Sequence, residues 1–249
     1  MIQTMPWLFL LCLFFISFLY ASVGHGGASG YLALMALFGM APAVMKQSAL
    51  IMNIFVSLIA FYEYHKAGHF KWKLFVPFAI ASIPASFIGA FVTVDPVLYK
   101  KVLGLILIFP ILRLLGVFGP GSQETKPVNP YWAFFIGGAI GFLSGMIGIG
   151  GGIILSPVII LLKWGNMKET AAVSALFIFV NSTSGIIALL GKGMVIDHAV
   201  YIWVMVAVTG GFLGAYLGSK KFTNPVLNKI LAVVLFIASI KLLGVPEKR

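Results

Sequence analysis

Charged residues are scarce in this 249-residue chain, at 9% of the total, and only six residues are acidic. A soluble domain carries about a quarter charged residues, so the composition excludes an ordinary soluble protein. Hydrophobic residues make up 61% of the sequence, and the mean hydropathy is +1.07. The apolar runs are continuous rather than alternating, which argues against a β-barrel and predicts an all-α integral membrane protein.

The few acidic residues are badly placed for ion coupling. All of them fall near the ends of predicted helices or in loops: Glu63, Asp95, Glu124, Glu169, Asp197 and Glu247. Carriers driven by protons or sodium commonly use an acidic residue within the membrane. The pattern therefore argues against coupling through a carboxylate.

The sequence also has little cysteine and no motif that binds a metal or a cofactor. The single cysteine, Cys12, excludes an internal disulfide bond. The sequence contains no metal-ligand spacing and no phosphate-binding loop. It therefore predicts no metal and no cofactor, and it excludes ATP-driven transport by this chain alone.

Basic residues outnumber acidic ones and give a net charge of +11. The lysines are spread over every loop without a basic tract, which predicts contact with anionic lipid headgroups and no nucleic-acid binding. We expect a multi-pass protein of the cell (inner) membrane. Its expected partners are the lipid bilayer and a small anionic substrate, and a homo-oligomer is possible. Residues 1–22 end like a signal peptide, but no basic residue precedes the apolar run, so we expect a mature helix.

Glycine, by contrast, is abundant, and it gathers at 148–152 in a region without charge between Lys126 and Lys163. Glycine is poor inside a helix, so we expect a helix that breaks here and restarts with Ser156 as N-cap and Pro157 at its first position. Broken backbone at membrane depth is tolerated where it is buried in protein or lines a wet cavity. Free amides at a helix start make an anion site.

The glycine loop is one half of a duplication, at an offset of 124 to 129 residues. The matched segments are Trp7 with Trp132, Gly24-His25-Gly26-Gly27 with Gly148-Ile149-Gly150-Gly151, Ser48-Ala49-Leu50 with Ser174-Ala175-Leu176, Gly89-Ala90 with Gly214-Ala215, Asp95-Pro96-Val97-Leu98 with Asn224-Pro225-Val226-Leu227, and Arg113-Leu114-Leu115-Gly116 with Lys241-Leu242-Leu243-Gly244. Internal repeats are a hallmark of transporter folds. We divide the chain into a first membrane repeat (1–117), a polar linker (118–130) and a second membrane repeat (131–249).

Each repeat is predicted to contain five helical segments. They cover 7–22, 30–39, 48–64, 73–92 and 97–116 in the first repeat, and 131–146, 153–163, 171–190, 198–217 and 225–243 in the second. A full crossing needs about 20 residues, so the second segment of each repeat is too short. We expect a glycine-rich re-entrant hairpin plus three spanning helices in each half. The distribution of basic residues favours two inverted repeats.

In an inverted pair, the two glycine loops approach each other near the midplane and offer amide donors to a small anion. The candidate substrate-binding residues are Gly24, His25, Gly26, Gly27, Ser48, Asn53, Gly148, Gly150, Gly151, Gly152, Ser174 and Asn181. The alternative for the glycines is close helix packing, since Gly141 with Gly145 and Gly148 with Gly152 fit the small-xxx-small pattern. His25 is either a packed neutral histidine or a donor and proton-sensitive gate.

An enzyme is the competing class. Gly27-Ala28-Ser29-Gly30 fits the GxSG signature of rhomboid-type intramembrane proteases. That chemistry requires a histidine within hydrogen-bond reach of the serine. The later histidines lie at predicted helix ends, and the second half has no serine at the matching place, so we expect no enzyme and no catalytic residue.

The glycine loops carry a family resemblance that covers nearly the whole chain. The second half has Gly141-Phe142-Leu143-Ser144-Gly145, Gly148-Ile149-Gly150-Gly151-Gly152 and Pro157, followed by Ala171-Ala172-Val173-Ser174-Ala175-Leu176, Gly193 with Asp197, and Gly214-Ala215. These motifs resemble the sulfite exporter TauE/SafE family. The first half departs at His25, Ala28 and Ala33.

The resemblance implies a transporter of small sulfur-containing anions such as sulfite or organosulfonates. A membrane potential that is negative inside drives anions outward, at ~2.3 kcal/mol per charge per 100 mV, so export requires no coupling ion. We therefore expect an exporter that works by alternating access. An anion channel with the same site is the alternative.

Overall fold

The computed structural model describes residues 7–117, 125–220 and 225–244, and all regular structure in this part of the chain is helical. The helices are α1 (Trp7–Ser22), α2 (Ala28–Leu37), α3 (Pro42–Lys66), α4 (Trp72–Phe91), α5 (Pro96–Ile106), α6 (Ile108–Leu114), α7 (Pro130–Ile147), α8 (Gly152–Leu161), α9 (Met167–Gly191), α10 (Ala199–Lys220) and α11 (Pro225–Leu243). Five of them, α3, α4, α7, α9 and α10, are long and apolar enough to cross a membrane. The predicted all-α class is confirmed.

Several predicted boundaries are wrong, among them that of α9, which begins at Met167, four residues before the expected start. The single helix expected over 97–116 is divided at Leu107, because Pro110 has no N–H to donate to the Ile106 carbonyl. α3 begins at Pro42, six residues before the expected start, with proline at its first position. α8 begins at Gly152 rather than beside Ser156, because the left-handed Gly151 already turns the chain into the helix.

Two helical hairpins carry the glycine loops at their tips. In the first hairpin, α1 and α2 meet at their outer ends, where the Phe9 and Phe38 rings are 5.2 Å apart. In the second, the chain just before α7 and just after α8 is joined by a 2.7 Å hydrogen bond from the Lys126 N–H to the Lys163 carbonyl. Each loop therefore lies at the far end of an antiparallel helix pair.

Glycine stripes on α7 and α10 pack the two halves of the chain together. A Cβ atom at Gly141 of α7 would lie 2.3 Å from the Ser82 carbonyl oxygen of α4, and one at Gly145 would lie 1.9 Å from that of Ser86. Gly214 of α10 packs in the same way on α1, where a Cβ would be 2.0 Å from the Phe18 carbonyl oxygen. Close helix packing, the alternative for Gly141 and Gly145, is confirmed.

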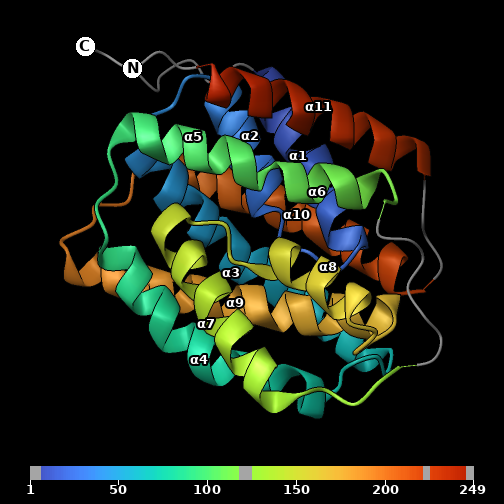
Figure 1. The fold of residues 1–249 in the computed structure, drawn as a ribbon. Coiled ribbons are helices and arrows are strands. Elements are labelled where there is room, and N and C mark those ends of the chain that lie inside the picture. The colour runs from blue at the N-terminus through green and yellow to red at the C-terminus, as the bar shows by residue number, and fades with distance from the viewer. Residues whose placement is uncertain (1–6, 118–124, 221–224, 245–249) are drawn as a thin grey trace.

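α3 and α9 cross the middle of the bundle, with α4 and α7 on one side and α1, α2, α5 and α11 on the other (Figure 1). They run antiparallel, since Lys168 at the start of α9 lies 5.5 Å from the ring centre of Tyr64 near the end of α3. The Asn53 Nδ2 and Ser182 Oγ atoms, near the middle of both helices, are 3.4 Å apart. These two helices form the wall against which both hairpin tips pack.

Candidate functional site

The two glycine loops meet at one side chain, Asn53 of α3. A Cβ atom at Gly26 would lie 2.8 Å from Asn53 Oδ1, and a Cβ atom at Gly150 would lie 2.7 Å from Asn53 Nδ2. The same two positions would be 3.0 and 2.8 Å from Cγ2 of Ile178 on α9. The Asn53 amide is thus enclosed between the two loops, and only glycine allows both backbones to approach this closely.

The helices that leave the loops start without a side-chain cap. The N-cap residue of α2 is Gly27 and that of α8 is Gly151, with φ angles of 95° and 77° in the left-handed region. Neither residue has a side chain that can accept a hydrogen bond from the first N–H groups of its helix. Both hairpins therefore keep uncapped amide donors at the loop.

A buried hydrogen-bond network joins the first loop to the second hairpin. His25 Nε2 lies 2.8 Å from the Ser156 hydroxyl, and His25 Nδ1 lies 2.9 Å from the Val23 carbonyl oxygen. The Ser156 hydroxyl also lies 2.7 Å from the Ser174 hydroxyl and 2.8 Å from the Gly152 carbonyl oxygen. Of the two alternatives for His25, the packed histidine describes this arrangement, and no contact in the structure tests a gating role.

The proton count of this network depends on the charge of His25. Neutral His25 donates from Nδ1 to Val23 and must accept at Nε2, so the single Ser156 proton goes to the ring. Charged His25 donates from both nitrogens, which frees the Ser156 proton for the Gly152 carbonyl. Every hydrogen-bonding group of the network therefore has a partner in both protonation states of His25. The Ser156 proton points to the first loop in one state and to the second hairpin in the other.

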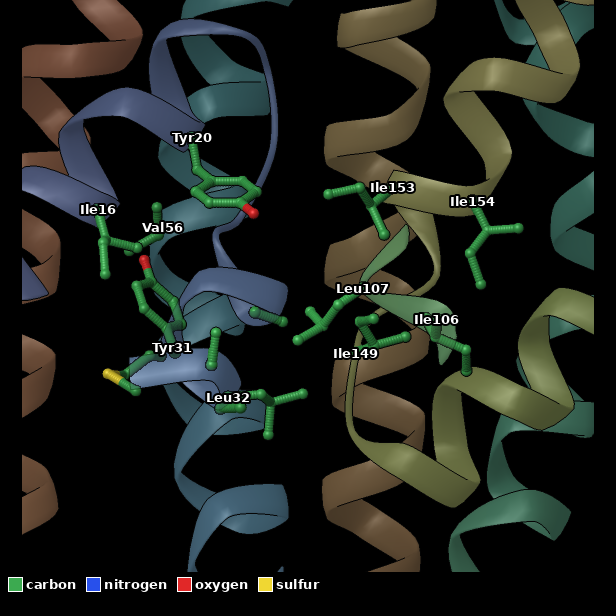
Figure 2. Packing of buried hydrophobic residues seen from close by; sticks show 14 of the residues in the cluster. Ile16, Tyr20, Tyr31, Leu32, Val56, Ile106, Leu107, Ile149, Ile153 and Ile154 are labelled. Carbon is green, nitrogen blue, oxygen red and sulfur yellow. The ribbon is translucent and has the colours of Figure 1, made fainter. Parts of the chain in front are cut away.

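The matched serines of the duplication lie in different surroundings. Ser174 has Ser156 as its partner, whereas the buried Ser48 hydroxyl has none. The counterpart of Ser156 in the first half is Leu32, which has no hydroxyl. Leu32 belongs to the same buried cluster as Ile149, the counterpart of His25, and Figure 2 shows both among the packed apolar side chains. The positions of His25 and Ser156 thus form hydrogen bonds, whereas their counterparts in the duplication, Ile149 and Leu32, are apolar.

Several buried polar atoms have no hydrogen-bond partner among the described residues. They are Ser48 Oγ, Asn53 Oδ1, Arg113 Nη1, Ser144 Oγ, Thr170 Oγ1 and Asn181 Oδ1. Each such atom costs about 1–3 kcal/mol, and buried polar groups in proteins are normally paired. Three of them belong to predicted site residues, Ser48, Asn53 and Asn181, and the other three were not predicted. Atoms of this kind require a partner that the protein does not supply, such as a buried water molecule or a ligand.

The outer glycines of the loops have packing contacts instead. Gly24 lies against Ala171 of α9, and Gly148 lies against Lys46 of α3. Gly27 and Gly152 lie against Tyr31 and Ile178. Asn181 donates its Nδ2 hydrogen to the Phe177 carbonyl within α9. The structure therefore brings Gly26, Gly150 and Asn53 together and leaves the other predicted residues around them.

Sequence reasoning missed two tyrosines that hold the loops. Tyr64 donates its hydroxyl to the Ser22 carbonyl at the end of α1, at 2.9 Å. Tyr99 donates to the Ile147 carbonyl at the end of α7, at 2.7 Å. Both satisfy helix-end carbonyls that have no partner within the helix. No spacing in the sequence relates Tyr99 to Ile147, so this pairing needed the tertiary structure.

The serine of the GxSG signature does not contact a histidine. Ser29 donates its hydroxyl to the Tyr20 hydroxyl at 2.6 Å, while His25 contacts Ser156. The described residues also contain no group of three metal-ligating side chains. The geometry required for the protease-type reaction is therefore missing at Ser29.

Comparison with known sequences agrees with the membrane architecture. Residues 9–242 match the sequence profile of the family described as "Sulfite exporter TauE/SafE". The chain belongs to this family. The protein is therefore a membrane transporter, and a lipid bilayer surrounds it.

Curated relatives carry similar names. A protein of Sinorhizobium fredii named "Probable membrane transporter protein y4hK" is 37% identical over 234 residues, which cover 92% of this chain and 95% of the relative. "Probable membrane transporter protein YunE" of Bacillus subtilis is 25% identical over 230 residues, covering 81% of each chain. No solved structure gives a significant match.

Proposed function

We propose that this TauE/SafE transporter carries a small oxyanion or sulfonate across the cell's inner membrane, bound between the two glycine loops at Asn53. The observation that carries this proposal is the approach of Gly26 and Gly150 to opposite sides of the Asn53 amide. An amide can turn either its oxygen or its NH2 group toward a ligand. Both loops would then contact one small molecule.

The chemistry around Asn53 favours an anion. The starts of α2 and α8 carry uncapped amides and the positive ends of their helix dipoles. Ser144 lies beside the second loop, with its Cβ 3.4 Å from the place of a Cβ at Gly151, and its hydroxyl has no partner among the described residues and can donate a further hydrogen bond. Ser48 Oγ and Arg113 Nη1 are likewise buried without such a partner. The acidic residues that the structure describes lie in the first or last turn of a helix or just before one, as in Asp95 and Glu169. An anion would therefore find donors at the loops and carboxylates only at the helix ends.

Inverted repeats over 1–117 and 131–249, separated by the linker 118–130, give this site its symmetry. Support comes from the antiparallel course of α3 and α9, which are corresponding helices. α4 follows α3 in the chain and runs parallel to α7, and α10 follows α9 and runs parallel to α1. Since α3 and α9 are antiparallel, α4 and α10 point in opposite directions. The same then holds for their parallel neighbours, α7 and α1. In a bilayer, the two hairpins would enter from opposite faces as re-entrant pairs.

We propose a carrier that alternates access between the two membrane faces rather than a channel. The halves interlock through α4 with α7 and α1 with α10, and rocking of one pair against the other would open the site to each side in turn. The family description supports sulfite or an organosulfonate as substrate. Export along the membrane potential needs no acidic coupling residue.

The test is sulfite flux in liposomes that contain the purified protein with Asn53→Leu. Leucine has a similar size but cannot hydrogen-bond, so we expect at least tenfold slower flux from the loss of one buried polar partner. Thr209→Val is the matched control, because the Thr209 hydroxyl is exposed and bonds only within α10. Flux by Asn53→Leu equal to that of the control would contradict the site.

A further inference from the structure

A cavity of about 460 Å³ opens where α3 begins and where α4 and α9 end. Its polar lining consists of Lys46, Gln47, Thr93, Tyr99 and Lys192, and no acidic side chain lines it. The acidic residues nearest to it in sequence accept hydrogen bonds from helix starts: Asp95 from the N–H groups of Val97 and Leu98, and Asp197 from the N–H group of Ala199. Among the described residues, neither Lys46 nor Lys192 forms an ion pair with an acidic side chain.

The two lysines meet at neighbouring backbone positions. Lys46 Nζ donates to the Ala90 carbonyl at 3.1 Å, and Lys192 Nζ donates to the Phe91 carbonyl at 2.7 Å and to Thr93 Oγ1 at 3.3 Å. Two ammonium groups that bind adjacent carbonyls repel each other. An anion between them would remove that repulsion.

The remaining donors suit an oxyanion. An ammonium group has three hydrogens. Lys46 uses one of them on a carbonyl and Lys192 uses two, which leaves two donors on Lys46 and one on Lys192. Three donors from two cations match an anion with several equivalent oxygens and two negative charges better than they match a monatomic ion such as chloride.

The cavity adjoins the second glycine loop. A Cβ atom at Gly148 would lie 3.0 Å from Cγ of Lys46, so the lysine stem rests on this glycine. Tyr99, which also lines the cavity, donates to the Ile147 carbonyl directly before the loop. An anion held by the Lys46 ammonium would therefore be bound by a side chain that packs on the second glycine loop.

We propose that Lys46 and Lys192 form an entrance site that binds a small divalent oxyanion before it reaches the glycine loops. The role as an entrance rests on the proposed function, but binding at this site does not. The site is separate from Asn53 and lies at one end of the bundle. The position matched to Lys46 in the second half is Ala172, and there Lys168 of α9 donates to the Gly218 and Ser219 carbonyls at the end of α10.

Chemical protection tests binding without transport. The purified protein is treated with an amine-acylating reagent in the presence of sulfate or chloride at equal ionic strength, and modification of each lysine is measured by mass spectrometry. We expect sulfate to protect Lys46 and Lys192 at about tenfold lower concentration than chloride, as charge-assisted hydrogen bonds predict. Lys241 is the internal control, because it caps the Leu37 carbonyl outside the cavity. Equal protection of Lys241, or no preference for sulfate, would overturn the proposal.

Variants separate binding from helix capping. Lys192→Met should weaken sulfate protection of Lys46 about tenfold, while Lys192→Arg should restore it, since arginine keeps the charge. Lys241→Met should leave protection unchanged. Wild-type protection of Lys46 in Lys192→Met would refute the paired site. Sulfate protection without any sulfite flux would refute the proposed function alone, and flux without protection would refute this entrance site alone.

Discussion

Replacing Gly150 by alanine separates the backbone cost of the glycine loop from its contact with Asn53. The φ angle of Gly150 is 76°, where an alanine costs roughly 1–2 kcal/mol. The added Cβ would also lie 2.7 Å from Asn53 Nδ2 and 2.8 Å from Ile178 Cγ2. Both side chains belong to the interior wall, so making room for the methyl group adds about 1–3 kcal/mol of overpacking.

Gly39→Ala is the matched control for this substitution. Gly39 has a φ angle of 74°, and a Cβ atom there would meet nothing within 4 Å. It therefore carries the backbone cost alone. We expect a smaller loss of melting temperature for Gly39→Ala than for Gly150→Ala, measured on the purified proteins in detergent.

Sulfite flux in liposomes then decides between packing and function. We expect Gly39→Ala to transport like the wild type, and we expect Gly150→Ala to lose at least tenfold in flux per folded molecule, because a displacement of about 1 Å at a binding group costs about a hundredfold in rate in other sites. Gly150→Ala with wild-type flux and an unchanged KM would refute the assignment of this loop to the substrate path.

Three further predictions concern stability. Ser156→Ala removes the hydroxyl between His25 and Ser174, so we expect a loss of about 1–3 kcal/mol and a lower melting temperature; an unchanged melting temperature would contradict the network. Gly141→Ala would place a Cβ 2.3 Å from a backbone oxygen of α4 and should abolish a monodisperse gel-filtration peak, whereas Gly138→Ala, with its nearest contact at 3.6 Å, should keep it. Desolvation, and then the nearby positive charge of Lys168, lower the pKa of His69 below its usual range. Because the unfolded chain then binds the proton more readily, stability should fall as the pH drops below about 6.5, and His69→Gln should reduce this acid sensitivity in a thermal melt.

The duplication in the sequence predicted which segments come together. Two glycine loops at a constant offset, each followed by a short helix, implied that Gly26 and Gly150 occupy equivalent positions. The structure places both against Asn53. This part was predictable because glycine in an apolar run breaks a helix wherever the rest of the fold lies.

The polar network was not predictable from the same repeat. Ser48 and Ser174 match in sequence, but among the described residues only Ser174 has a hydroxyl partner, Ser156, and the sequence counterpart of Ser156 in the first half is Leu32, which has no hydroxyl. The His25 contact with Ser156 crosses between the halves, and no local pattern encodes such a contact. A repeat predicts equivalent backbone positions, whereas hydrogen bonds depend on the residues that face them.

The entrance lysine was missed because of a helix boundary. With the predicted helix starting at 48, Lys46 was one of the loop lysines that we expected to face anionic lipid headgroups. The proline at the first position of α3 begins this helix at Pro42, which places Lys46 in its second turn against Gly148. Proline at a helix start is a recognised signal, and giving it more weight would have moved the boundary.

The most direct test of the account is anion flux through the purified wild-type protein in liposomes, with sulfite and a small sulfonate compared with chloride, and with and without an imposed membrane potential. We predict saturable sulfite flux that responds to the potential and that is faster when unlabelled sulfite is present on the opposite side, as a carrier with alternating access requires. Flux that does not saturate would indicate a channel. No flux of any sulfur-containing anion through folded protein would contradict the proposed substrate and leave the helical architecture and the family membership in place.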